Sequence, residues 1–184
     1  MEQTLPKMIR HTAQTYPDIA AQYYRTSSGI FEPVLYKDFF DIALHFGGGL
    51  LSLGIKRGDL IGLISDNRKE WQQADVGIMA IGAIDVPRGS DATIKDLQYI
   101  LSFTDCKTVI AENASQIKKI LSIKTELPEL QRIIYFEEPG QNEMSEAQNK
   151  KIEIFSFQNI VEAGRKFRAE NDGVVEAELE KGQR

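Results

Sequence analysis

From Leu60 onward, short apolar runs alternate with segments of helical periodicity, and this alternation restricts the fold more than any other feature of the chain. Nearly every residue in four of the runs is apolar, as in strands that are buried on both faces: residues 60–64, 83–86, 108–111 and 133–136. Strands that alternate with helices in this way pair in parallel. The pattern predicts an α/β fold with a doubly wound, mostly parallel sheet and crossover helices.

Three segments between these runs carry one apolar stripe each, with spacings of three and four residues that are typical of amphipathic helices. The stripes are Trp71, Ala74, Ile78 and Ile81 in the first segment, Ile94, Leu97 and Leu101 in the second, and Ile117, Ile120 and Leu121 in the third. Thr93 and Asp96 have the spacing of a capping box, in which each side chain bonds the other residue's backbone N–H. The second helix is therefore expected to begin directly after Thr93.

The chain ahead of this repeat predicts an N-terminal β-hairpin followed by a long helix. Residues 20–25 and 31–36 flank the turn sequence Thr-Ser-Ser-Gly, and residues 37–53 have helical periodicity that ends at Gly54. Inside this helix, the triplet Gly47-Gly48-Gly49 costs about 2–3 kcal/mol relative to three alanines. We expect a neighbouring element to pack closely against the triplet, because neither a preceding strand nor a following Lys-Ser or Lys-Thr supports a phosphate-binding role.

The C-terminal part of the chain carries weaker signals. Residues 137–151 are polar and aperiodic, and we expect a polar surface excursion there. A short strand at 152–155 and a helix at 157–167 are expected next, followed by a mostly charged tail whose last residues fray. The sequence thus predicts one N-terminal subdomain over residues 1–184, with its core at about 4–136 and a loosely packed C-terminal part at 152–184.

Charge and cysteine content restrict the function classes. The 184 residues include 22 basic and 27 acidic side chains, and the net charge of −5 argues against broad binding to the nucleic-acid backbone. A single cysteine, Cys106, allows no internal disulfide, and no run approaches the roughly 18 apolar residues of a membrane span. We therefore expect a cytoplasmic protein without nucleic-acid partners. Neither His11 nor His45 has cysteines or paired carboxylates at ligand spacing, so no metal site is expected.

In an open parallel sheet, ligands bind beyond the carboxyl ends of the strands. Three loops meet this condition, at residues 65–68, 88–91 and 112–115. The second is the most suggestive, because Gly89 permits close approach of a ligand and Arg88 places a positive charge near the capped helix. Phosphate binding and ordinary turn chemistry both remain open for Arg88, Gly89 and Ser90. Asp66 or Asn67 is expected to cap the following helix.

The run IGLISDNRKEW at residues 61–71 resembles the N-terminal region of AMP-forming long-chain fatty acid–CoA ligases, which are acyl-CoA synthetases of the adenylate-forming superfamily. The resemblance includes the preceding run GLLSLGIKRGD and the later Ala74-Asp75 and Ala80-Ile81-Gly82-Ala83. It extends to QIKKIL at 116–121, LPELQRII at 127–134, Thr4-Leu5-Pro6 and Tyr16-Pro17-Asp18, and covers about residues 4–136. It implies that the fold is part of the N-domain of an adenylate-forming ligase.

The resemblance implies a two-step reaction, in which ATP and a fatty acid give an acyl-adenylate and pyrophosphate, and the thiol of coenzyme A (CoA) then displaces AMP. The implied cofactors of the whole enzyme are ATP, Mg²⁺ and CoA, and the implied partners of this chain are the remainder of the N-domain and a C-terminal domain. The 184 residues contain neither the family's motif Thr-Ser-Gly-Thr-Thr-Gly-x-Pro-Lys-Gly nor another nucleotide-loop or nucleophile-elbow motif. We therefore assign no catalytic residue and expect the chain alone to be inactive and to bind no cofactor tightly.

In related ligases, the loops that correspond to residues 88–91 and 113–116 approach the nucleotide end of CoA. The resemblance therefore implies a CoA-proximal position for six residues: Arg88, Gly89, Ser90, Asn113, Ser115 and Gln116. Ligases of the family commonly have an apolar and aromatic segment where this chain has Pro-Arg-Gly-Ser-Asp. A homodimer and a peripheral contact with the inner face of a membrane, through the lipid substrate, remain open. So do two other functions, a stand-alone binding or interaction module and a flavodoxin-like nucleotide-binding domain.

Overall fold

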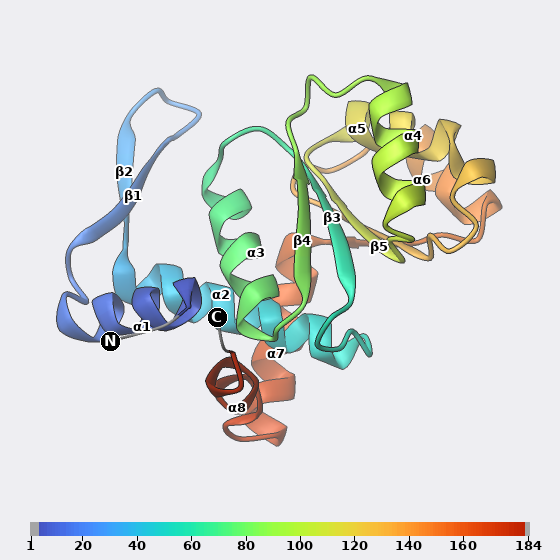
Figure 1. Cartoon of the computed structure of the whole chain (residues 1–184). Helices are drawn as coiled ribbons and strands as arrows, with labels where there is room; N and C mark the ends of the chain where they lie inside the picture. Colours follow the sequence, from blue (N-terminus) through green and yellow to red (C-terminus); the bar gives the residue numbers. More distant parts are fainter. Residues whose placement is uncertain (1–3, 183–184) are drawn as a thin grey trace. The chain divides into compact units, whose positions relative to one another are not determined.

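The structure is a computed structural model that describes residues 4–182, and the chain divides into two compact units (Figure 1). The first unit contains the chain up to Arg57, the segment Asn67–Ala83, and the chain from Ile160 onward. The second unit contains Gly58–Asp66 and Ile84–Asn159. Each unit is therefore built from segments that are separated in the sequence.

A five-stranded parallel sheet forms the centre of the second unit. Its strands are β3 (Leu60–Ile64), β4 (Ile84–Arg88), β5 (Thr108–Ala111), β6 (Arg132–Tyr135) and β7 (Glu153–Ser156). They lie in the order β4-β3-β5-β6-β7, so the chain moves from β3 to one side and then winds to the other. All neighbouring strands are parallel, which confirms the expected α/β class and doubly wound strand order. Pro87 lies in β4, an edge strand, where the missing N–H is tolerated.

The helices of the second unit are α4 (Ile94–Phe103), α5 (Ala114–Ser122) and α6 (Gln141–Asn149), with a 3-10 turn, η1 (Lys124–Glu126), after α5. The predicted stripes of α4 and α5 pack in one core cluster with strand residues, except for Ile94 in the first turn of α4, which is exposed. The cluster includes Leu97, Leu101, Ile117, Ile120, Val109 and Ile133. The predicted capping box is confirmed. The Thr93 hydroxyl accepts from the Asp96 N–H, and the Asp96 carboxylate accepts from the Thr93 N–H at 3.0 Å.

Residues 137–151 are mostly polar and at least partly exposed, but the segment is not irregular as its aperiodic sequence suggests, because α6 occupies most of it. Helix α6 lies in the connection between the parallel strands β6 and β7. Its buried residue is Ala147, and its remaining side chains are polar apart from Met144. A helix that buries one small residue leaves almost no periodic signal in the sequence. The ion pair between Glu146 and Lys150 stabilises the helix by only about 0.3–0.5 kcal/mol.

The described residues of the first unit form a hairpin and five helices. Strands β1 (Ala20–Arg25) and β2 (Phe31–Leu35) pair in antiparallel orientation, as predicted. The helices are α1 (Leu5–Thr15), α2 (Tyr36–Ser52), α3 (Lys69–Ala80), α7 (Phe157–Glu170), which starts in the second unit, and α8 (Val174–Glu180). Gly54 has φ +81° directly after α2, which confirms it as the predicted stop. None of the helices between residues 4 and 182 is long and apolar enough to cross a membrane.

Glycines allow α2 to lie against two other helices at backbone contact. A Cβ atom added to Gly77 of α3 would lie 2.6 Å from the Ala43 carbonyl oxygen, and one added to Gly47 would lie 2.9 Å from the Gly77 oxygen. On α7, a Cβ at Gly164 would overlap the His45 carbonyl, and one at Gly49 would overlap the backbone of Ile160. The close packing predicted for the glycine triplet is therefore confirmed.

We predict that Gly49→Ala lowers the free energy of unfolding by more than about 2 kcal/mol, although alanine favours a helix over glycine by about 1 kcal/mol. The added methyl group meets backbone atoms of α7, which cannot rotate away. Gly48→Ala is the matched control, because a Cβ there would lie 3.0 Å from the flexible Arg168 Cγ and 3.1 Å from the Gly164 carbonyl oxygen, which is a less severe contact than at Gly49, and a smaller loss is expected. Urea unfolding of both variants measures the difference. Equal stabilities of Gly49→Ala and the parent chain would contradict the packing described.

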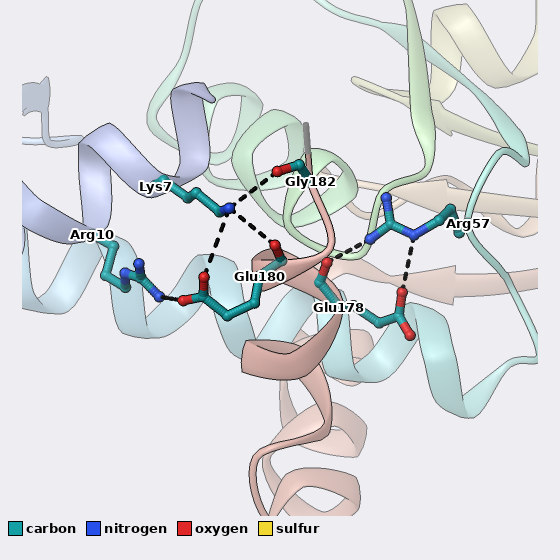
Figure 2. Close-up of polar contacts among 6 residues, drawn as sticks. All are labelled: Lys7, Arg10, Arg57, Glu178, Glu180 and Gly182. Atoms are coloured by element: carbon teal, nitrogen blue, oxygen red, sulfur yellow. Dashed lines mark hydrogen bonds and ion pairs between the residues drawn. The ribbon is translucent and has the colours of Figure 1, made fainter. Parts of the chain in front are cut away.

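The C-terminal part is not loosely packed, and this expectation is wrong for the residues described. Val175 and Leu179 of α8 are buried, and two clusters of polar contacts hold the helix (Figure 2). Lys7 donates to the carbonyl oxygens of Glu180 and Gly182, each at 3.0 Å. The contacts of α8 come from residues far away in the sequence, which explains why its short pattern carries little signal. Residues 183–184, on which the predicted fraying falls, lie outside the described residues.

The clusters also include two arginines. Arg10 pairs with the Glu180 carboxylate, and Arg57 donates to the carbonyl oxygen of Glu178 and, at 3.2 Å, to its carboxylate (Figure 2). Helix α8 is thereby tied to α1 and to the loop that follows α2.

Candidate functional site

The carboxyl ends of β4, β3 and β5 lie side by side, and the winding of the chain reverses between β3 and β5. This is the place where ligands bind in doubly wound sheets. Backbone hydrogen bonds continue past the strand ends, because the Ser65 N–H donates to the Arg88 carbonyl at 3.0 Å and the Glu112 N–H to the Ile64 carbonyl at 2.9 Å. The three predicted loops therefore start next to one another, and we name this edge, residues 65–66, 88–92 and 112–116, the switch-point edge.

Asp66 holds Ser90 at the centre of the switch-point edge. Its carboxylate accepts hydrogen bonds from the Ser90 hydroxyl and, at 3.0 Å, from the Ser90 N–H, and these bonds lower the pKa of Asp66. The expectation that Asp66 or Asn67 caps α3 is wrong, since the capping position belongs to Arg68, whose side chain makes no capping bond. The Asp66 carboxylate instead accepts both hydrogen bonds from Ser90, 24 residues later. A contact over this sequence distance cannot be predicted from a local motif.

Helix α5 holds the same loop through its first turns. Asn113 is the N-cap, and its Oδ1 accepts from the N–H groups of Ser115 at 3.0 Å and Gln116 at 3.3 Å. The buried Gln116 side chain donates to the Ser90 carbonyl at 3.1 Å, and Lys119 Nζ donates to the same carbonyl at 2.9 Å. Lys119 was not among the predicted residues. Lys119 lies three residues after Gln116, so both side chains are on one face of α5. This spacing was the one sequence signal that could have added Lys119 to the predicted site.

The remaining predicted residues lie at the rim of the switch-point edge. A Cβ at Gly89 would lie 2.7 Å from the Asp91 carboxylate, so a side chain there would require the Asp91 side chain to move. Arg88 is the last residue of β4 rather than a loop residue, and its side chain is exposed. Hydrogen bonds from Thr93, with a smaller contribution from the charge of Arg88, lower the pKa of Asp96. Arg88 therefore does place a positive charge near the start of α4.

The structure thus brings the six predicted residues to one edge, but most of their polar groups hold the loop itself. Exceptions are the exposed Arg88 and Ser115 side chains, and Gln116 Oε1, which is buried and has no hydrogen-bond partner among the described residues. Asp66 and Glu112 bring negative charge to the same place, where the Asp66 N–H donates to Glu112 Oε2 at 3.2 Å. Between residues 4 and 182, no group of three or more His, Cys, Asp or Glu side chains is arranged to hold a metal ion. The edge can contact a polar ligand, and the pairing of the Ser90 hydroxyl with the Asp66 carboxylate holds the loop.

We predict that Asp66→Ala increases the hydrogen-exchange rate of residues 88–92 several-fold, because Ser90 loses two of its hydrogen bonds. Asp91→Ala is the matched control, since it removes an exposed carboxylate from the same loop and leaves the bonds of Ser90 in place. Mass spectrometry of exchanged peptides provides the measurement. An unchanged rate in Asp66→Ala would show that Gln116 and Lys119 hold the loop without Asp66.

Comparison with known proteins connects this geometry to a group of enzymes. Residues 9–173 match the family model described as AMP-binding enzyme. The chloroplastic long-chain-fatty-acid–[acyl-carrier-protein] ligase AEE15 of Arabidopsis thaliana is 29% identical over 168 residues, which are 90% of this chain and 22% of that protein. The long-chain-fatty-acid–CoA ligase ACSBG2 of Xenopus laevis is 22% identical over 162 residues, 88% of this chain and 21% of that protein. The chain spans about a fifth of the length of these curated relatives.

Solved structures agree on the fold. The adenylation domain of a carboxylate reductase from Mycobacterium chelonae matches with a TM-score of 0.76 at 18% identity, over 89% of this chain and 29% of that domain. The A domain of a carboxylic acid reductase from Segniliparus rugosus, solved with AMP and a co-purified carboxylic acid, matches with a TM-score of 0.74 at 17% identity, over 89% of this chain and 30% of that one. The α/β sheet and the hairpin are therefore those of the N-terminal part of an adenylation domain.

Proposed function

The chain belongs to the AMP-binding enzyme family, and we propose that it is the N-terminal part of an ATP-dependent ligase that activates long-chain fatty acids. The observation that carries the proposal is the family match over residues 9–173, together with relatives named as long-chain fatty acid ligases. The strand order is also that of flavodoxin-like domains, so topology alone does not separate the two functions, and the family match favours the ligase.

The proposed reaction has two balanced steps. A carboxylate oxygen of the fatty acid attacks the α-phosphorus of ATP, and the bond to the β-phosphate oxygen breaks, which releases pyrophosphate. In the second step the thiol loses its proton to solvent, its sulfur attacks the acyl carbon of the adenylate, and AMP leaves as the C–O bond to its phosphate breaks. Mg²⁺ would stabilise the charge on the phosphates in the first step. Because the described residues form no carboxylate cluster for this ion, we assign no part of that step to them.

We assign the switch-point edge to the thiol acceptor, with CoA as the first candidate. Arg88 supplies an exposed positive charge for a phosphate of the nucleotide, and the exposed Ser115 side chain supplies a hydroxyl group for hydrogen bonds. The second candidate is an acyl-carrier protein, because the 29% identical Arabidopsis relative is named for that acceptor. The carboxylates of Asp66 and Glu112 beside the edge weaken its attraction for the phosphates of CoA and leave Arg88 as the main positive group.

A test of the activity uses the full-length protein with ATP, Mg²⁺ and palmitate. Exchange of labelled pyrophosphate into ATP that depends on palmitate reports the first step, and thioester formation with CoA or with phosphopantetheinylated acyl-carrier protein reports the second. We expect fatty-acid-dependent exchange and one productive acceptor. The 184-residue chain alone should produce no thioester. If palmitate gives no exchange in the full-length protein, the proposed function is wrong, and binding of FMN by the chain would favour the flavodoxin-like alternative.

The site assignment has a separate test. Arg88→Ala should raise the KM for CoA at least about fivefold, equivalent to about 1 kcal/mol for a lost charge-assisted hydrogen bond, and leave pyrophosphate exchange unchanged. Lys95→Ala is the matched control, because it removes another exposed positive charge near the start of α4. An Arg88→Ala enzyme with an unchanged KM for CoA would refute the assignment without affecting the proposed activity.

A further inference from the structure

His45 of α2 lies in a network of charged groups that fixes its protonation state. Its Nδ1 is 2.9 Å from Arg168 Nη1 of α7, and its Nε2 is 3.2 Å from a carboxylate oxygen of Asp41. A guanidinium group only donates hydrogen bonds, so Nδ1 must accept. The ring proton therefore lies on Nε2 and is donated to Asp41, and the geometry requires a neutral imidazole.

Arg168 joins three helices through the same guanidinium group. Besides His45 of α2, it contacts Glu176 of α8 at 2.5 Å and lies 3.6 Å from Asp41. The Arg168 side chain is 19% exposed, which makes these contacts less screened than surface ion pairs. Loss of the bond to His45 would therefore disturb the link between α7 and α8 as well.

Solvent reaches this network through a groove of about 320 Å³. The groove is lined by His45, Arg165, Arg168, Ala169, Asp172, Gly173 and Glu176. The His45 side chain is 13% exposed, so protons can reach the ring although most of it is covered.

We propose that protonation of His45 breaks its bond to Arg168 and loosens the turn between α7 and α8, so that the network acts as an acid-sensitive latch. A second proton would sit on Nδ1 and point at Arg168 Nη1, which also carries hydrogen. One hydrogen bond is thereby replaced by two donors and two positive charges that face each other at 2.9 Å. Arg168 then moves away from the ring, and its bond to Glu176 no longer holds α8 to α2.

The surrounding charges determine the direction of the effect. Burial lowers the pKa of His45, the carboxylate of Asp41 opposes this, and the charges of Arg168 and Arg165 lower the pKa further. Asp172 and Glu176 add negative charge along the groove. With the pKa below its ordinary value of 6.5, the unfolded chain binds more protons than the folded chain in this range. The stabilisation is complete above pH 6.5 and is lost as the pH falls through the lower pKa of the folded chain.

Hydrogen exchange at pH 7.5 and 5.5, corrected for the intrinsic effect of pH on exchange, tests the latch. We expect the protection of residues 168–176 to fall at least about fivefold at the lower pH, about 1 kcal/mol in local stability. His45→Gln should remove this pH effect, because glutamine can accept from Arg168 and donate to Asp41 but does not titrate in this range. His11→Gln is the matched control, since His11 is the other histidine of the chain and is exposed on α1. Loss of protection that persists in His45→Gln would overturn the proposal.

Titration of the histidine rings by NMR in the unmodified chain tests the proposal without relying on the folding of the His45→Gln variant. The proposal requires the Nε2–H tautomer for His45 at neutral pH and a pKa below 6.5. Arg168→Met should raise that pKa, because it removes a positive charge next to Nδ1. A neutral-pH ring with hydrogen on Nδ1, or a pKa at or above 6.5, would overturn the latch. This inference is independent of the proposed ligase activity.

Discussion

Helix α2 can lie against both α3 and α7 only because glycine leaves room for backbone at each contact. Gly47 meets Gly77 on one side, and Gly49 meets Gly164 on the other. The atoms on the far side of these contacts are carbonyl groups, which cannot rotate away as a side-chain end can. The same approach places His45 beside Arg168, because the carbonyl of His45 touches Gly164 and Arg168 lies one helical turn later. The charged network of the first unit therefore depends on a contact between uncharged backbones.

The switch-point edge of the second unit is organised around one residue. Ser90 receives two hydrogen bonds through its carbonyl, from Gln116 and Lys119, and gives two to the carboxylate of Asp66. Loops from three strands are thereby fixed before any ligand arrives, and less conformational entropy is lost on binding. Arg88 does not take part in the fixing bonds of Ser90, which leaves its charge available for a ligand.

Local chemistry explains which elements could be predicted from the sequence. Strands β3, β5 and β6 are mostly apolar and buried, whereas β4 contains Asp85 and Arg88 and has no buried residue, because it lies at the edge of the sheet rather than being covered on both faces as expected. Helices α3 to α5 have clear stripes, and the capping box at Thr93 needs only a spacing of three residues. Helix α6 has one buried side chain and α8 has two, so neither produces a periodic pattern. Tertiary contacts stabilise them, and such contacts are absent from any short window of sequence.

In the candidate site, too, the features set by local sequence could be predicted and those set by tertiary contacts could not. Strand ends could be placed from the apolar runs, and the rule for parallel sheets then brought the six predicted residues to one edge. The pairing of Asp66 with Ser90 and of Lys119 with the Ser90 carbonyl joins residues 24 and 29 positions apart. Such pairs depend on the register of the strands and on side-chain geometry, which a single sequence does not specify. For this reason Asp66 was assigned to a local cap, and Lys119 was missed.

The ties between α8 and α1 have a consequence for the order in which the protein forms on the ribosome. Lys7 is bonded to the carbonyl of Glu180, 173 positions later, so this contact of the first unit forms only after Glu180 has been synthesised. The second unit is complete at Asn159 and can fold earlier, with its strands following one another along the chain. Until α7 emerges, the glycine surface of α2 that contacts Ile160 and Gly164 has no partner on that side.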